Sequence, residues 1–194
     1  MNYVAERLKN MELYRLVERI LAGFCLFIPL VLMLVENNGN ESFSIRPSIS
    51  DYVYMDKSFV FGSLLTIAAL LFFFNGILHF RDESRERKKP QAKWYNAVLG
   101  LSLFGVIFFP YKELPVPHYI SAVIFFGGSI LVIALFCDHQ DRRLSWILAA
   151  LASLSYILYF LIPDVFGKSS LFWAEWISLT VIGIHFILES LQNR

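Results

Sequence analysis

Residues 58–93 read SFVFGSLLTIAALLFFFNGILHFRDESRERKKPQAK, a long apolar stretch followed at once by a cluster of charged residues. At a rise of about 1.5 Å per residue, the apolar part forms a helix of roughly 30 Å, which is the thickness of the hydrocarbon core of a bilayer. The six Lys and Arg residues in 81–93 are typical of the cytoplasmic flank of a membrane span. This segment therefore predicts a transmembrane helix whose C-terminal end faces the cytoplasm.

Five further apolar stretches accompany this one. The chain is 57% apolar and 17% charged, with a mean hydropathy of +0.56, which excludes an ordinary water-soluble domain. We therefore predict an all-α fold, a polytopic membrane helical bundle with six transmembrane helices. The predicted spans are 20–35, 58–78, 95–109, 119–137, 144–162 and 171–188, of which the first and third are short.

Basic residues gather in every second flank between these spans. The flanks 1–19, 81–93, 138–143 and 189–194 hold thirteen Lys and Arg residues, whereas the three flanks between them hold four. Because cytoplasmic flanks are enriched in Lys and Arg, both termini are predicted to be cytoplasmic. The expected location is the cytoplasmic (inner) membrane of a bacterium, or an endomembrane or plasma membrane of a eukaryote.

The N-terminal flank is charged but carries apolar residues at helical spacing. Val4, Leu8 and Met11 recur on one face, so 1–19 is predicted as a short cytoplasmic amphipathic helix on the inner leaflet. The six-span transmembrane domain is then 20–190. The alternative is that the flank forms a cytoplasmic extension of the first span.

Small residues indicate where transmembrane helices approach one another. They are frequent in 119–137 and in 144–162, and only a short loop joins these two spans. We therefore expect the two spans to pack as an antiparallel hairpin.

Three short motifs on the predicted outer side carry a family resemblance. They are Pro47-Ser48-Ile49-Ser50-Asp51 with Phe59-Val60-Phe61, His118 followed by Ser121-Ala122 and Phe125-Phe126, and the pair Glu175-Trp176. Through these motifs the chain resembles the DRAM-like (damage-regulated autophagy modulator) six-span membrane proteins and their bacterial relatives. The resemblance implies a six-helix architecture with polar motifs on the outer face, in a family with no established catalytic chemistry.

Glu175 is the sharpest candidate residue because it lies inside the last predicted span. A carboxylate at this depth costs free energy unless it is paired, hydrated or protonated. The expected partners are Arg46, Lys57 and His118. The cluster is interpreted either as a clamp that pins the outer loop onto the bundle, or as a pocket for a lipid headgroup or small polar ligand, with catalysis as a third alternative. The predicted outer-face cluster is Arg46, Ser50, Asp51, His118 and Glu175.

Three of the four histidines, His79, His139 and His185, fall near the predicted cytoplasmic interface. Acidic residues accompany them, and Glu189 follows His185 by four positions, which puts both on one helix face. Imidazoles and carboxylates are the ligand types of a catalytic zinc site. These histidines are therefore a candidate metal site, and the alternative is that they anchor helix ends.

The inner loop between the second and third spans is strongly basic. It attracts anionic lipids with a free energy on the order of 1 kcal/mol per basic group, and it also offers a docking surface to a soluble cytoplasmic partner. It lacks the interleaved aromatics of a nucleic-acid module, so no direct nucleic-acid binding is predicted. Its basic residues are Arg81, Arg85, Arg87, Lys88, Lys89 and Lys93.

Three classes of function follow from these patterns. The sequence contains no phosphate-binding glycine loop, nucleophile elbow or Ser/His/Asp arrangement, which favours a non-enzymatic protein without a cofactor. The leading class is a lipid- or envelope-sensing membrane subunit that couples to a cytoplasmic partner. The second is a homo-oligomeric channel or pore, or a membrane effector of a bacterial stress or phage-defence system, although no span shows a polar stripe. The third is a lipid metallohydrolase at the inner histidines.

Overall fold

The computed structural model describes residues 2–39, 42–81, 94–136, 142–162 and 167–191. Within these ranges all regular secondary structure is helical, which confirms the all-α prediction there. Two short 3₁₀ helices, η1 (Ser50–Tyr54) and η2 (Gly167–Ser169), accompany the α-helices. The α-helices are α1 (Asn2–Asn37), α2 (Ser58–Arg81), α3 (Tyr95–Phe108), α4 (Pro115–Leu135), α5 (Arg142–Leu161) and α6 (Ser170–Leu191).

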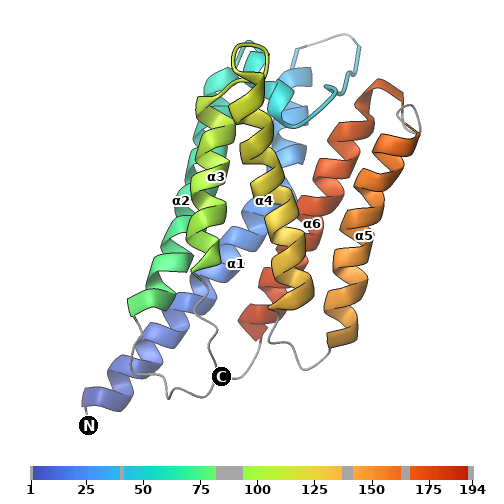
Figure 1. Cartoon of the computed structure of the whole chain (residues 1–194). Helices are drawn as coiled ribbons and strands as arrows, with labels where there is room; N and C mark the ends of the chain where they lie inside the picture. Colours follow the sequence, from blue (N-terminus) through green and yellow to red (C-terminus); the bar gives the residue numbers. More distant parts are fainter. Residues whose placement is uncertain (1, 40–41, 82–93, 137–141, 163–166, 192–194) are drawn as a thin grey trace.

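The α-helices lie side by side in an up-and-down bundle (Figure 1). The N-terminal end of α1 and the C-terminal end of α6 lie at one end of the bundle, which we call the termini end. The connection from α1 to α2, which contains η1, and the connection from α3 to α4 lie at the opposite end, which we call the cap end (Figure 1). The cap end therefore brings together segments that are far apart in the sequence.

Five of the helices are long and apolar enough to cross a membrane. Their candidate spans are Glu12–Asn37, Ser58–Leu78, Pro115–Leu135, Arg142–Leu161 and Ser170–Leu191. The helix α3 is apolar but has only 14 residues, a length of roughly 21 Å. Its shortness agrees with the short third span that the sequence predicts.

The helix α1 differs from its prediction. It is one continuous helix of 36 residues, which runs without a break from the N-terminal flank into the first apolar stretch. The sequence between residues 2 and 22 contains no Gly or Pro that would end a helix. Leu13, Leu16 and Ile20 are exposed on the outside of the bundle, where a lipid-facing surface is expected. The N-terminal segment is therefore helical and continuous with the first span, which agrees with the alternative interpretation.

Glycines allow close helix contacts at several positions, of which Gly76 and Gly183 are two. At Gly76 of α2, an added Cβ atom would collide with the backbone of Ala97 in α3. At Gly183 of α6, it would lie 3.1 Å from the carbonyl oxygen of Ala22 in α1. These glycines allow the backbones of α2 and α3, and of α1 and α6, to approach closely.

The predicted pairing of the fourth and fifth spans is only part of the packing. The helix α5 contacts α4, but it packs more extensively on α6. The Ser155 hydroxyl of α5 donates to the carbonyl oxygen of Ala174 in α6 at 3.4 Å. The small residues of α5 therefore serve the contact with α6 as well as the hairpin with α4.

The helix α6 is the most enclosed of the five candidate spans. In the apolar 18-residue window of its span, 56% of the residues are buried, compared with 22% in that of α5. Phe72 of α2 contacts Phe125 of α4 and Phe186 of α6, with ring centroids 5.3 and 5.5 Å apart. This aromatic contact joins three helices in the middle of the bundle.

The contact at Gly76 gives a matched test of the packing. Gly76→Ala forces α2 and α3 apart, so we expect a loss of about 1–3 kcal/mol of stability, the usual cost of overpacking. Gly62→Ala is the control because it lies in the same helix and its added Cβ atom meets nothing within 4 Å. The thermal unfolding midpoint of detergent-solubilised protein should fall for the first variant only. Equal midpoints would contradict the contact.

Candidate functional site

The cap segment, which we define as residues 47–54, begins with a turn held by Ser48. The Asp51 N–H donates to the Ser48 hydroxyl at 3.1 Å and to the Ser48 carbonyl oxygen at 3.3 Å. The hydroxyls of Ser48 and Ser50 lie 3.0 Å apart. A serine that accepts from a backbone N–H three residues later favours the start of a helical turn. This turn leads into η1 and directs the Asp51 side chain.

Two hydrogen bonds attach the cap segment to α6, and we call them the cap latch. The backbone N–H of Ile49 donates to Oε2 of Glu175 at 2.6 Å, and both residues are buried. The backbone N–H of Phe172 donates to the carbonyl oxygen of Pro47 at 2.9 Å. Tyr52 is fully buried and packs on the Phe172 ring at a centroid distance of 6.0 Å. The cap segment is therefore fixed to the first turns of α6.

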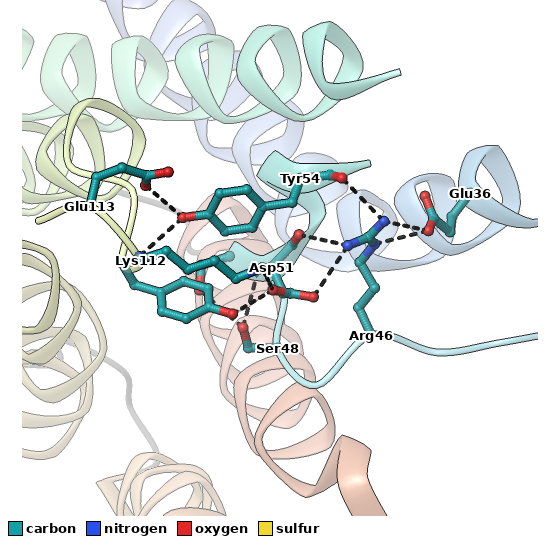
Figure 2. Close-up of polar contacts among 9 residues, drawn as sticks. Glu36, Arg46, Ser48, Asp51, Tyr54, Lys112 and Glu113 are labelled. Carbon is teal, nitrogen blue, oxygen red and sulfur yellow. Dashed lines mark hydrogen bonds and ion pairs between the residues drawn. The ribbon is translucent and has the colours of Figure 1, made fainter. Parts of the chain in front are cut away.

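Arg46 connects the cap segment to the end of α1 (Figure 2). Its guanidinium donates twice to Oε1 of Glu36, at 2.6 and 3.0 Å, and once to Oδ2 of Asp51 at 3.3 Å. It also donates to the carbonyl oxygen of Tyr54 at 3.4 Å. Burial alone would lower the pKa of Arg46, but the hydrogen bonds and charges of the two carboxylates outweigh it and raise the pKa.

Asp51 is the junction between the cap segment and the loop from α3 to α4. The Tyr111 hydroxyl donates to Oδ1 of Asp51 at 2.6 Å, and Nζ of Lys112 lies 3.9 Å from the same oxygen. Burial, and then the hydrogen bond to Asp51, raise the pKa of Tyr111. Tyr111 therefore stays protonated and remains a donor to Asp51 well above neutral pH.

Tyr54 makes a second connection to that loop. Its hydroxyl donates to Oε2 of Glu113 at 2.8 Å and accepts the backbone N–H of Lys112 at 3.0 Å. Its ring meets the Tyr111 ring edge-on at a centroid distance of 5.5 Å. The cap segment is thus bound to α1, α6 and the loop from α3 to α4.

A cavity of about 40 Å³ lies beneath the cap segment. Its polar lining is Ser50, His118 and Glu175, and apolar side chains from α1, α2, α3, α4 and α6 form the rest. Nδ1 of His118 lies 2.8 Å from the carbonyl oxygen of Phe109. A cavity of this size holds a few water molecules, because one water needs about 10–15 Å³ on this measure. A lipid headgroup does not fit in this conformation.

The five residues of the predicted outer-face cluster all lie at the cap end, in two adjoining groups. Arg46 and Asp51 belong to the ion-pair network, whereas Ser50, His118 and Glu175 line the cavity. The expected pairing of Glu175 with Arg46 is not found, and His118 shares only the cavity with Glu175. The partner of Glu175 is a backbone N–H, while Arg46 binds Glu36 and Asp51 instead.

Sequence reasoning missed several members of the network. Glu36 and Tyr111 are not among the predicted site residues, although both contact Arg46 or Asp51. Tyr54 and Lys112 were given no part in the site. The one available signal was their predicted place on the same face of the membrane, which does not specify which side chains meet.

The termini end contains a second group of buried polar residues. Nε2 of His185 lies 3.6 Å from Oε1 of Glu189, which confirms that the two share a face of α6. The Asn96 side chain of α3 donates to the Asn75 side chain of α2 at 2.7 Å. Within the described ranges, no three His, Cys, Asp or Glu side chains are arranged to hold a metal ion.

The other predicted residues at this end are only partly covered by the structure. His79 and Arg81 belong to the last turn of α2, for which the backbone alone is described. His139 and the remaining basic residues of the inner loop lie outside the described residues: Arg85, Arg87, Lys88, Lys89 and Lys93. The metal site and the basic docking surface therefore stay predictions.

A line of buried polar side chains runs along one face of α6 and was not predicted from the sequence. Glu175, Ser178, His185 and Glu189 are all buried and follow one another at helical spacing. The line is interrupted between residues 178 and 185, where buried Val181 and Ile182 stand. Polar groups thus mark both ends of α6, with an apolar middle.

The chain belongs to a family of unknown function, DUF7103, whose model matches residues 27–190. No curated protein and no solved structure matches the chain. The match includes the cap segment, the polar line of α6 and all of the cavity lining except Cys25. It does not include the N-terminal part of α1.

The hydrogen bond from Tyr111 to Asp51 can be tested by deleting one hydroxyl. Tyr111→Phe should cost about 1–3 kcal/mol of stability, because a partly buried carboxylate loses a donor. Tyr119→Phe is the control, since the Tyr119 side chain is exposed at the same end of the bundle. The free energy of unfolding of Tyr119→Phe, measured by chemical denaturation, should stay within about 0.5 kcal/mol of that of the unmodified protein. A similar loss in both variants would argue against a specific role for Asp51.

Proposed function

We propose that this chain is a non-enzymatic, six-span integral membrane protein that senses the lipid or envelope environment at its cap end and couples it to a soluble cytoplasmic partner. In this proposal both termini are cytoplasmic and the cap end faces outward. The observation that carries it is the cap latch, which joins the outer loop to the most enclosed helix of the bundle.

The distribution of charge supports this orientation. The flanks at the termini end hold thirteen of the seventeen Lys and Arg residues. An enrichment of this kind favours the cytoplasmic side. The resemblance of the cap motifs to DRAM-like proteins points to the same six-span arrangement.

The arrangement of α6 supports the coupling. Its first turns hold the cap segment through Phe172 and Glu175, and its last turns hold the buried pair His185 and Glu189. A displacement of the cap segment therefore acts on the helix whose other end reaches the cytoplasmic side. The cavity is too small for a lipid headgroup, so the exposed surface of the cap end is the better place for recognition.

A pore is the second candidate because of the polar line on α6. Buried Val181 and Ile182 interrupt that line, so conduction would require the bundle to open. Passage of ions through liposomes that contain the purified protein would favour the pore. Liposomes that remain impermeable to ions would favour the sensing function.

The coupling can be tested at Glu175. Glu175→Leu removes the acceptor of the Ile49 N–H and leaves that buried donor unsatisfied, at a cost of about 1–3 kcal/mol. We expect faster amide hydrogen exchange in the cap segment and also in residues 185–190 of α6, measured by mass spectrometry on protein in nanodiscs. Glu175→Gln is the matched control because it keeps an acceptor oxygen and loses only the ionisable group.

Two outcomes separate the interpretations. Faster exchange at both ends of α6 in Glu175→Leu, but not in Glu175→Gln, would support coupling. Faster exchange confined to the cap segment would reduce the cap latch to a local clamp and overturn the sensing role of α6.

A further inference from the structure

Lys112 places its ammonium group in a small cage at the surface of the cap end. Nζ lies 3.9 Å from the centroid of the Tyr54 ring, 5.7 Å from that of Tyr111, and 3.9 Å from Oδ1 of Asp51. Figure 2 shows the Lys112 side chain reaching past Tyr54 toward Asp51. Aromatic faces together with a carboxylate are the usual recognition elements for an ammonium group. We call Tyr54, Tyr111 and Asp51 the ammonium cage.

Lys112 holds its place weakly. Its side chain is 54% exposed, and its distance to Asp51 is close to the limit for an ion pair. Arg46, by contrast, is 21% exposed and makes two short hydrogen bonds to Glu36. Exposed pairs of a flexible lysine with a carboxylate contribute little free energy. Lys112 can therefore leave the cage without disturbing the rest of the network.

An excess of negative charge remains at the cage when Lys112 leaves. Arg46 is shared between Glu36 and Asp51, so one guanidinium serves two carboxylates. Glu113 adds a further carboxylate beside the Tyr54 hydroxyl. Another positive group of similar size would find the same aromatic face and the same carboxylate.

The surroundings of the cage are those of a membrane interface. Large apolar side chains stand exposed beside it in the last turn of α3, in the loop and in the first turns of α4. Such residues favour the boundary between hydrocarbon and headgroups. The exposed apolar residues are Phe108, Leu114, Val116 and Tyr119.

We propose that the ammonium cage binds the ammonium group of a phospholipid headgroup from the adjoining leaflet, and that Lys112 is a built-in competitor which occupies the cage in its absence. This rests on the proposed function, because it names the ligand class that the cap end senses. The Lys112 ammonium shows in the structure how such a headgroup is held.

The test uses the purified full-length protein and three lipids, phosphatidylethanolamine, phosphatidylcholine and phosphatidylglycerol, with bound lipid measured by native mass spectrometry. Lys112→Met vacates the cage and should raise the affinity for the two ammonium lipids about two- to fivefold, the range that one exposed cation–π contact provides. Lys112→Arg keeps a cation in the cage and should remain at the low affinity. Phosphatidylglycerol, which carries no ammonium group and is anionic, should gain nothing from either change, because Lys112→Met removes a basic group that attracts it.

The cage residues supply the second arm of the test. In the Lys112→Met background, Tyr54→Phe keeps the ring and should keep the gain, whereas Tyr54→Leu should lose it. An equal gain for phosphatidylglycerol, or no difference between Lys112→Met and Lys112→Arg, would overturn the proposal even if Tyr54→Leu fails to fold. An equal affinity for free ethanolamine and for phosphatidylethanolamine would overturn the assignment to a lipid headgroup, because the acyl chains and the membrane interface would then contribute nothing.

This result is independent of the exchange experiment on Glu175. Ammonium-selective binding without coupling along α6 would support the cage but contradict the sensing function. Coupling without ammonium selectivity would support the sensing function but contradict this choice of ligand.

Discussion

The cap end depends on one hydrogen bond, from the backbone N–H of Ile49 to the buried carboxylate of Glu175 at 2.6 Å. A polar side chain inside a membrane span is costly unless it is satisfied, and a buried backbone N–H is equally costly without an acceptor. Each group removes the other's penalty, so the bond fixes the cap segment at one place on α6. The turn at Ser48, the burial of Tyr52 and the direction of Asp51 all follow from that position.

From this fixed point the charged groups can be shared among several segments. Asp51 stands between Arg46, which reaches α1, and Tyr111, which belongs to the loop from α3 to α4. Because these partners are partly shielded from water, their interactions are stronger than those of freely exposed pairs. Lys112 is the exception, since most of its side chain lies in solvent. The network therefore combines a rigid part around Arg46 with a replaceable cation at its rim.

The helices could be predicted from the sequence because they depend on local properties. The length of each apolar stretch determines where a span can form, and the short apolar stretch 95–109 correctly predicted that α3 is short. The N-terminal flank was predicted as a separate helix, whereas it is continuous with the first span, since no Gly or Pro separates the two. The partners at the cap end could not be predicted, because they depend on the path of the loop. Arg46 contacts Glu36 and not Glu175 because the cap segment is fixed to α6 at Glu175 by a backbone N–H. The close contact of Gly76 with Ala97 likewise depends on how α2 and α3 pack against each other.

The helix α6 unites these observations. It is the most enclosed span, it holds the cap segment at its first turns, and it closes against α1 through Gly183, where the backbones are too close for a larger residue without adjustment. Its polar residues lie at its ends, and its middle is packed with Val181, Ile182 and Phe186. A helix packed in this way moves as a rigid body more readily than it bends, since close-packed interiors transmit displacement. A change at the cap end is thus more easily passed along α6 than absorbed within it, which is the physical basis for the proposed coupling between the two ends of this helix.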